Sequence, residues 1–268
     1  MAIIAIAGIY NTETAEFRVT QLGFNRGLTA DLGGVYEDRD IVLSIPLTKR
    51  LTVQFPDAPY MAPNTTDNIF IAYVNLGGEG AHPVPGWDKQ GINSERQYVL
   101  ENFAQAPGDL FTFIARFMSN TPSTLPYSTV LQDGEGPLGD AIALGPLMGF
   151  PALLDPVDNG AMNQRTIRVR TPTGQQPSFY EFTFNTQDGT SWSAYLEGNR
   201  NKLILPTFPT YATEENAPFN LPPGGISGGL EAVFVPNFDY NNWSYLELWG
   251  AARRSWSNIN FRFVNGGN

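Results

Sequence analysis

The sequence predicts a mainly β protein: an antiparallel β-sandwich or jelly roll, or two packed sandwiches, with a short helical insertion near residues 94–118. Three observations predict this fold class. Short runs of β-branched and aromatic residues alternate with polar ones, turn residues separate the runs, and helices between successive runs are absent. A parallel α/β sheet would require such crossover helices.

The composition is typical of many strands joined by turns. Of 268 residues, 27 are glycine and 21 are proline, and charged residues make up 16%, against about 25% in an average globular protein. A chain of this length buries enough surface to fold without disulfides. It contains no cysteine, which excludes thiol catalysis, zinc–thiolate sites and iron–sulfur clusters.

The N-terminal half contains several predicted strands. Residues 2–10 form an uncharged, β-prone run, which we expect to be either a buried strand of its own domain or an arm that adds a strand to a neighbouring subunit. The apolar side chains of this candidate assembly arm are Ile3, Ile4, Ile6 and Ile9. Further strands are predicted at residues 16–20, 41–45, 50–55 and 69–75.

The pattern of residues 93–120 predicts two short helices. Ser94 and Gln97 match a capping box, and apolar residues follow at approximately helical spacing. Pro107 interrupts the pattern. The apolar residues after it recur at spacings of three, four and seven, and they are Leu110, Phe111, Phe113, Ile114, Phe117 and Met118. We expect these helices to pack on a sheet and connect two β-rich regions; the alternative is a groove for a partner.

The predicted organisation has three parts, which could also form a single domain. An N-terminal β-rich region over residues 1–120 ends in the helical segment, and residues 166–268 form a C-terminal β-rich region. Residues 121–165 form an irregular Pro/Gly-rich connection. Long irregular connections are uncommon unless they are functional, so we expect either a contact loop inserted into a neighbour or a lid over the β-core.

The C-terminal region shows the clearest alternation. Strands are predicted at residues 166–170, 180–184, 192–196, 202–205, 230–235, 244–249 and 258–264. Asp188-Gly189 is the strongest hairpin pattern in the chain. Residues 206–229 are predicted to be a loop, with Gly224-Gly225 and Gly228-Gly229 as turn residues.

The residue types of common catalytic sites are scarce. His82 is the one histidine, so a Ser-His-Asp triad would have to use it, and no G-x-S-x-G motif accompanies it. Multi-histidine metal sites and nucleotide-binding glycine motifs are absent. No catalytic residue, cofactor or metal is therefore predicted. The weak calcium candidates, which lack an EF-hand loop, are Asp38/Asp40, Asp155/Asp158 and Asp239/Asn241.

A glycoside hydrolase remains open because it needs only two carboxylates. The chain has 26 acidic residues, although no spacing singles out a pair. The acids near glycines or aromatic residues, as cleft acids often are, are Asp133/Glu135, Asp188, Glu197 and Asp239. Acids beside glycines are also typical of turns.

The charge and hydropathy patterns restrict the partners. The net charge of −10 argues against nucleic-acid binding through a basic patch. No run approaches the ~20 apolar residues of a transmembrane helix, and residues 1–9 lack the basic region of a signal peptide. Arginine supplies most of the positive charge, which suits pairing at interfaces between subunits; the alternative is compositional drift without a function.

Residues 239–243 are the best candidate for a recognition or interface surface. The segment consists of Asp239, Tyr240, Asn241, Asn242 and Trp243. Rings beside amides and an acid suit sugar binding, and aromatic side chains also anchor protein interfaces. The alternative is a Tyr/Trp pair packed at a hairpin corner.

These patterns predict a non-enzymatic structural protein that acts through homo-oligomeric assembly. The expected class is a virion subunit of the capsid type, whose partners are copies of itself and other structural proteins. The first alternative is a carbohydrate-recognising or tail/adhesin-type protein, which would bind a glycan at an extracellular or cell-surface location. A glycoside hydrolase is the second alternative.

Overall fold

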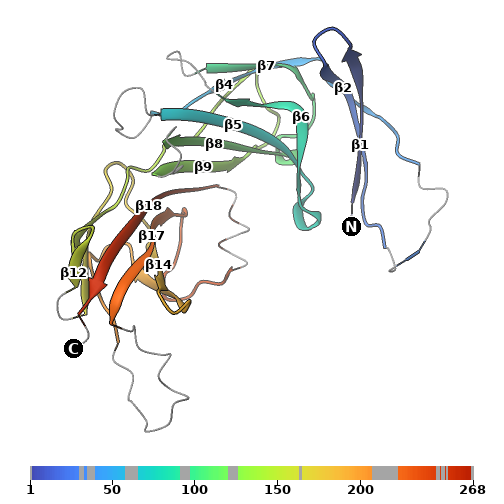
Figure 1. The fold of residues 1–268 in the computed structure, drawn as a ribbon. Helices are drawn as coiled ribbons and strands as arrows, with labels where there is room; N and C mark the ends of the chain where they lie inside the picture. Colours follow the sequence, from blue (N-terminus) through green and yellow to red (C-terminus); the bar gives the residue numbers. More distant parts are fainter. Residues whose placement is uncertain are drawn as a thin grey trace. The chain divides into compact units, whose positions relative to one another are not determined.

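The chain is mainly β and is built of several antiparallel sheets, an architecture consistent with the predicted β-sandwich (Figure 1). The computed structural model describes residues 2–29, 33–34, 40–57, 66–90, 97–119, 126–162, 165–206, 223–245, 248, 251 and 253–266. The chain divides into two compact units. Unit 1 is Met1–Pro56, Asp67–Arg116 and Leu131–Gly145, and unit 2 is Asp57–Thr66, Phe117–Val130 and Pro146–Asn268. The jelly-roll connectivity stays a prediction.

Unit 1 is built from three groups of strands. Its elements are β1 (Ile3–Asn11), β2 (Glu16–Asn25), β3 (Ile45–Pro46), β4 (Lys49–Gln54), β5 (Thr66–Asn75), η1 (Gly77–Glu79), β6 (Ala81–Gln90), β7 (Gln97–Phe103), η2 (Gly108–Leu110), most of β8 (Phe111–Ser119), the end of β9 (Tyr127–Asp133) and β10 (Ala141–Ala143). The orders are β1-β2-β3, β10-β4-β7 and β8-β5-β6. Prolines occur in β6, the edge strand of its group, where a missing backbone donor is tolerated.

An aromatic core joins the β4–β7 pair to the β5–β8 group. The rings of Phe103 on β7 and Phe111 on β8 lie 4.6 Å apart, and Phe70 on β5 lies 5.8 Å from Phe55, just after β4. Trp87 on β6 contacts Phe103 at 4.6 Å and donates its indole N–H to the carbonyl of Asn102. The two groups therefore face one another as layers of a sandwich do.

The predicted helical insertion near residues 94–118 is wrong. Its described part forms β7 and β8, which belong to different strand groups. Along β8 the buried apolar residues are Phe111, Phe113, Ala115 and Phe117, a period of two that places one face in the core. The apolar residues of this segment also match helical spacing. Pairing with strands distant in sequence makes the segment a strand rather than a helix. Gln97 begins β7, and Ser94 lies outside the described residues.

Unit 2 is built from two sheets. Its further strands are β11 (Ala152–Asp155), β12 (Gly160–Met162), β13 (Thr166–Arg170), β14 (Phe179–Thr186), β15 (Ser191–Glu197), β16 (Lys202–Ile204), β17 (Gly224–Phe234) and β18 (Arg253–Asn265). One sheet has the order β15-β14-β17-β18, with β12 parallel to β18, and the other has the order β11-β13-β16. The Pro/Gly-rich residues 121–165 thus contain β9 to β12.

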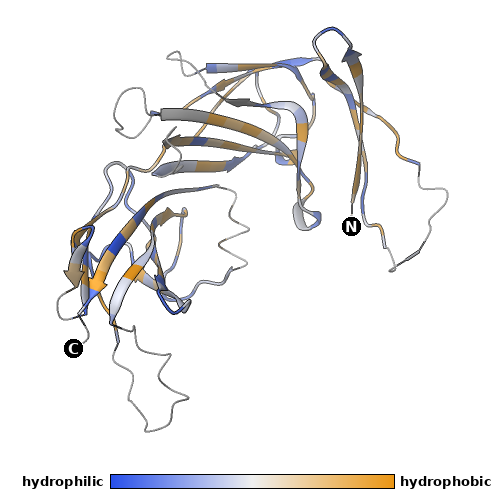
Figure 2. Ribbon diagram, in the orientation of Figure 1, coloured by the Kyte–Doolittle hydropathy of each residue, from blue (hydrophilic) through white to orange (hydrophobic). Residues whose placement is uncertain are grey.

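The sheet β15-β14-β17-β18 has two unlike faces, and Figure 2 shows hydrophobic and hydrophilic residues following one another along β18. Its core face packs on Ile167 and Val169 of β13. The side chains of this core face include Tyr180, Phe182, Phe184, Ile226, Leu230, Phe261 and Phe263. The opposite face, called the outer face below, carries the residues between them in sequence. The Asp188-Gly189 hairpin is confirmed, since Gly189 has a φ of 86° and Asp188 accepts the Thr190 N–H at 3.0 Å.

Two local predictions in unit 2 are wrong. Gly224 to Gly229 belong to β17 rather than to a loop. Gly228 must be glycine there, because a Cβ would collide with the carbonyl oxygen of Thr183 and lie 2.8 Å from the Phe261 ring. In the predicted strand at residues 244–249, the Leu248 N–H donates to the Ser244 carbonyl at 3.1 Å, which is a helical turn.

Neighbouring glycines of β17 provide a test of this packing. We expect Gly228→Ala to lower the free energy of unfolding by about 1–3 kcal/mol, because the methyl group overpacks the core against backbone. Gly229→Ala is the matched control, since a Cβ there has no neighbour closer than 3.6 Å. Urea denaturation of both variants measures the difference, and equal losses would contradict the register of β17.

Candidate functional surfaces

The β1–β2 hairpin, called the hairpin arm below, leaves one strand edge open. Within the described part of the chain β1 pairs only with β2, and β1 contains neither a charge nor a proline. Ile3, Ile6 and Ile9 are 41%, 38% and 57% exposed, while Ile4 is half-buried. Natural edge strands usually carry charges, prolines or bulges that block further pairing. The candidate assembly arm of the sequence is therefore an accessible edge strand.

The edge of β1 is also regular in geometry. The hairpin register moves from Ala7 opposite Gln21 to Gly8 opposite Val19, so the extra residue of the bulge is Thr20 on β2. β1 itself therefore contains no extra residue. A regular edge of this kind can accept another strand along all its backbone groups.

The hairpin arm is anchored to unit 1 through β2. Val19 and Leu22 are buried. Beyond β2, the Gly27 N–H donates to Glu79 Oε1 at 2.8 Å, and Arg26 Nε donates to Glu79 Oε2 at 2.9 Å. The Gly27 hydrogen bond and then the Arg26 guanidinium lower the pKa of Glu79 to about 2. This carboxylate holds the base of the arm while β1 stays open.

The Glu79 anchor predicts a pH dependence. A lowered pKa stabilises the folded protein above about pH 4.5, and this stabilisation is lost as the pH falls towards about 2. We expect Glu79→Gln to lower the melting temperature at pH 7 and to speed amide exchange in β1 and β2. The difference from wild type should vanish near pH 2. Glu13→Gln, an equal charge change at the arm's turn, is the control and should have little effect.

The candidate recognition residues 239–243 divide into packed rings and exposed polar groups. Trp243 lies 5.8 Å from Phe179 with rings 9° from parallel, and it contacts Tyr195, Phe238 and Tyr245 at 5.2–5.7 Å. Tyr240 is half-buried against the same cluster.

Asp239 accepts the Asn241 N–H at 3.0 Å and closes the turn, which leaves Asp239, Asn241 and Asn242 exposed. The sequence did not indicate Tyr245, which is 58% exposed and is the accessible ring of the cluster. The polar tip of the turn and the Tyr245 ring are therefore the groups that a partner could reach.

Next to this cluster the outer face of the sheet carries two facing glutamates. Glu181 of β14 is the register partner of Glu231 of β17. Tyr195 donates its hydroxyl to Glu181 at 3.1 Å, and Asn258 donates its amide to Glu231 at 3.2 Å. Burial raises the pKa of Glu231, and the charge of Glu181 raises it further. Burial also raises the pKa of Tyr195, as does its hydrogen bond to Tyr245.

The Glu181–Glu231 pair predicts a pH dependence of stability that is opposite in sign to the one predicted for Glu79. Because the pKa of Glu231 is raised, stability is lost as the pH rises above the ordinary glutamate value. We expect Glu231→Gln to raise the free energy of unfolding at pH 7 by about 0.2–1 kcal/mol, the cost of like charges facing across strands. The gain should be absent at pH 3. Glu135→Gln, at an exposed site in unit 1, is the control, and a loss of stability in Glu231→Gln would contradict this account.

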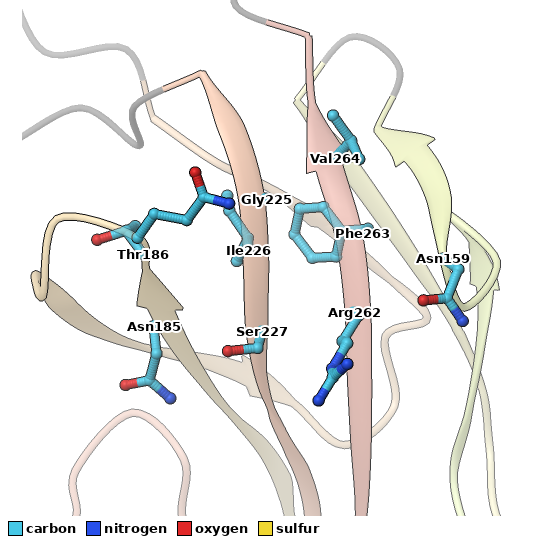
Figure 3. A pocket seen from close by; sticks show the side chains of 10 residues that line it. Asn159, Asn185, Thr186, Gly225, Ile226, Ser227, Arg262, Phe263 and Val264 are labelled. Carbon is cyan, nitrogen blue, oxygen red and sulfur yellow. The ribbon is translucent and has the colours of Figure 1, made fainter.

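A polar hollow lies further along the same outer face. It has a volume of about 530 Å³ and is lined by Asp158, Asn159, Asn185, Ser227, Gly228, Gly229, Asn260, Phe261 and Arg262. The register places Asn185 opposite Ser227 and Ser227 opposite Arg262, so the three side chains form one row. Figure 3 shows this row across β14, β17 and β18, with Asn159 beyond it. A smaller hollow of about 340 Å³ adjoins it and shares these four residues.

The turn before β12 completes the row. Arg262 donates its backbone N–H to Asp158 Oδ1 at 2.8 Å, and the Asn159 N–H donates to the Arg262 carbonyl at 2.6 Å. Residues more than a hundred positions apart in sequence thus line one hollow. No local motif could have indicated it, because only the strand register brings these residues together.

Three of the other acids considered from the sequence have local partners. Asp133 accepts from Thr112 and Asn75, Asp188 caps its own turn, and Glu197 pairs with Arg200 at 3.2 Å. Glu135 is exposed, and Asp38 lies outside the described residues. The contacts of Asp133, Asp188 and Glu197 are those of ordinary strand and turn residues. His82 is half-buried in β6, and the described residues provide no hydrogen-bond partner for its Nε2.

Comparison with known proteins does not indicate a function, so the proposed function rests on the surfaces described above. No protein-family model matches the sequence, and the comparison with curated proteins found no match. Among the described residues, no helix is long and apolar enough to cross a membrane, and no group of three or more His, Asp or Glu side chains could hold a metal ion.

Proposed function

We propose that the protein is a structural subunit that assembles with copies of itself, of the capsid type found in virions. The observation that carries this proposal is the regular, uncharged edge of β1 with its exposed isoleucines. Backbone groups along such an edge gain hydrogen bonds when a further strand is added, and the isoleucines gain apolar contact.

The electrostatics favour a second copy meeting at β1. Each chain carries a net charge of −10, so two copies repel one another over most of their surfaces. β1 has no charge and avoids this repulsion. Antiparallel pairing centred on Ile6 would place Ile3 opposite Ile9 and Ala5 opposite Ala7. This arrangement is self-complementary, as a two-fold contact requires.

The composition supports further contacts between subunits. The chain has three lysines and thirteen arginines, and arginine pairs with carboxylates and packs at interfaces better than lysine does. Other structural proteins of the same particle are proposed as additional partners, and the virion is the proposed location. The jelly-roll topology common among capsid subunits belongs to this proposal as well.

The assembly proposal predicts the effect of a charge on β1. We expect Ile9→Lys to weaken self-association at least about tenfold, or about 1.4 kcal/mol, because a lysine blocks the edge and loses apolar contact. Size-exclusion chromatography with light scattering measures the change over a range of concentrations. Ile204→Lys is the matched control, since Ile204 is an equally exposed isoleucine on the edge strand β16.

A second measurement uses the absence of cysteine in the chain. Under oxidation, Ile6→Cys should form a disulfide-linked dimer, because residue 6 lies at the centre of the proposed pairing and meets its own copy. Val42→Cys, at an exposed site outside the strand pairings, should not. A wild-type protein that stays monomeric at high concentration, or equal crosslinking of both variants, would overturn the proposal.

A further inference from the structure

Gly229 leaves room for a side chain on the outer face of unit 2. Glycine in a strand is unfavourable by roughly 0.5–1 kcal/mol relative to alanine, so a packing reason is normally present. Gly228 has such a reason in the Thr183 carbonyl and the Phe261 ring, but Gly229 has none, because the nearest atom to a Cβ there would be Asn258 Oδ1 at 3.6 Å. Gly229 forms part of the floor of the polar hollow.

The groups around this floor combine donors and acceptors. Asn159, Asn185 and Asn260 present amides, Ser227 presents a hydroxyl, and Arg262 presents a guanidinium. The guanidinium of Arg262 has no ion-pair partner within the described residues, and its backbone is fixed on both sides by Asp158 and Asn159. A ligand with several hydroxyl groups matches this set, since each hydroxyl both donates and accepts.

The charges select the class of ligand. Asp158 and Arg262 contribute one charge of each sign to the hollow, so neither an anion nor a cation is favoured throughout. The net charge of −10 disfavours anions further. The volume of about 530 Å³ lies within the usual range of ligand sites, about 300–1,000 Å³, although the lining is more polar than in most of them.

We propose that this hollow binds a neutral saccharide, with Arg262, Asn185, Ser227 and Asn159 donating to and accepting from its hydroxyl groups. The site differs from the aromatic residues 239–243, and it belongs to unit 2, whereas the proposed assembly edge belongs to unit 1. The two proposals can therefore succeed or fail separately.

Gly229→Val is the sharpest test. Its Cβ would make only ordinary contacts, with Asn258 Oδ1 at 3.6 Å and the Ile259 carbonyl oxygen at 3.9 Å, and its methyl groups would occupy the floor of the hollow. Because valine is favoured in strands, the melting temperature should stay the same or rise. The purified full chain is applied to an array of neutral and acidic oligosaccharides, and the strongest neutral one is titrated by calorimetry. We expect Gly229→Val to weaken binding at least about tenfold. Ser193→Val, on the same face but outside the hollow, should bind as wild type does.

Arg262→Ala provides a second variant that leaves the backbone hydrogen bonds in place, and it should also weaken binding. Retention of wild-type affinity by Gly229→Val would overturn the proposal. Binding of acidic oligosaccharides alone, or of no oligosaccharide on the array, would overturn it as well.

Discussion

The alternation of side chains along β14, β17 and β18 is the constraint on which unit 2 depends. It places Phe182 and Leu230 in the core and their neighbours Glu181 and Glu231 on the outer face. A slip of one residue would exchange the two sets and bury carboxylates. The same register produces both the sandwich core and the polar surface, so the stability of the unit and its candidate binding hollow cannot be separated.

The sequence was sufficient where each strand shows alternation by itself. β13, β14 and β18 were predicted in this way, and so was the Asp188-Gly189 hairpin, because a short turn is a local property. β8 was mistaken for a helix because its apolar residues satisfy both periods, and long-range pairing resolved the ambiguity. The start of β17 was missed because glycine is required at position 228 by the Thr183 carbonyl and the Phe261 ring, which are both distant in sequence.

The candidate surfaces also differ in how much of each could be predicted from local sequence. The isoleucines of β1 could be recognised from sequence because an uncharged β-prone run is contiguous, although its exposure and regular edge required the register with β2. The turn at Asp239 was recognisable by composition, but the packing of Trp243 on Phe179 was not. The polar hollow had no sequence pattern at all, since Asp158, Asn185 and Arg262 meet only through three strand pairings and a turn.

The open edge of β1 also bears on the order of folding. β1 and β2 pair across a short turn, whereas β4 pairs with β10 across a long intervening stretch of chain. Local hairpins close in microseconds, and distant pairings form more slowly. The exposed apolar edge of β1 therefore depends on a local pairing, whereas other strands of unit 1 depend on distant ones. The rate of synthesis and the local concentration of chains then determine how much protein matures and how much is lost to irregular strand addition.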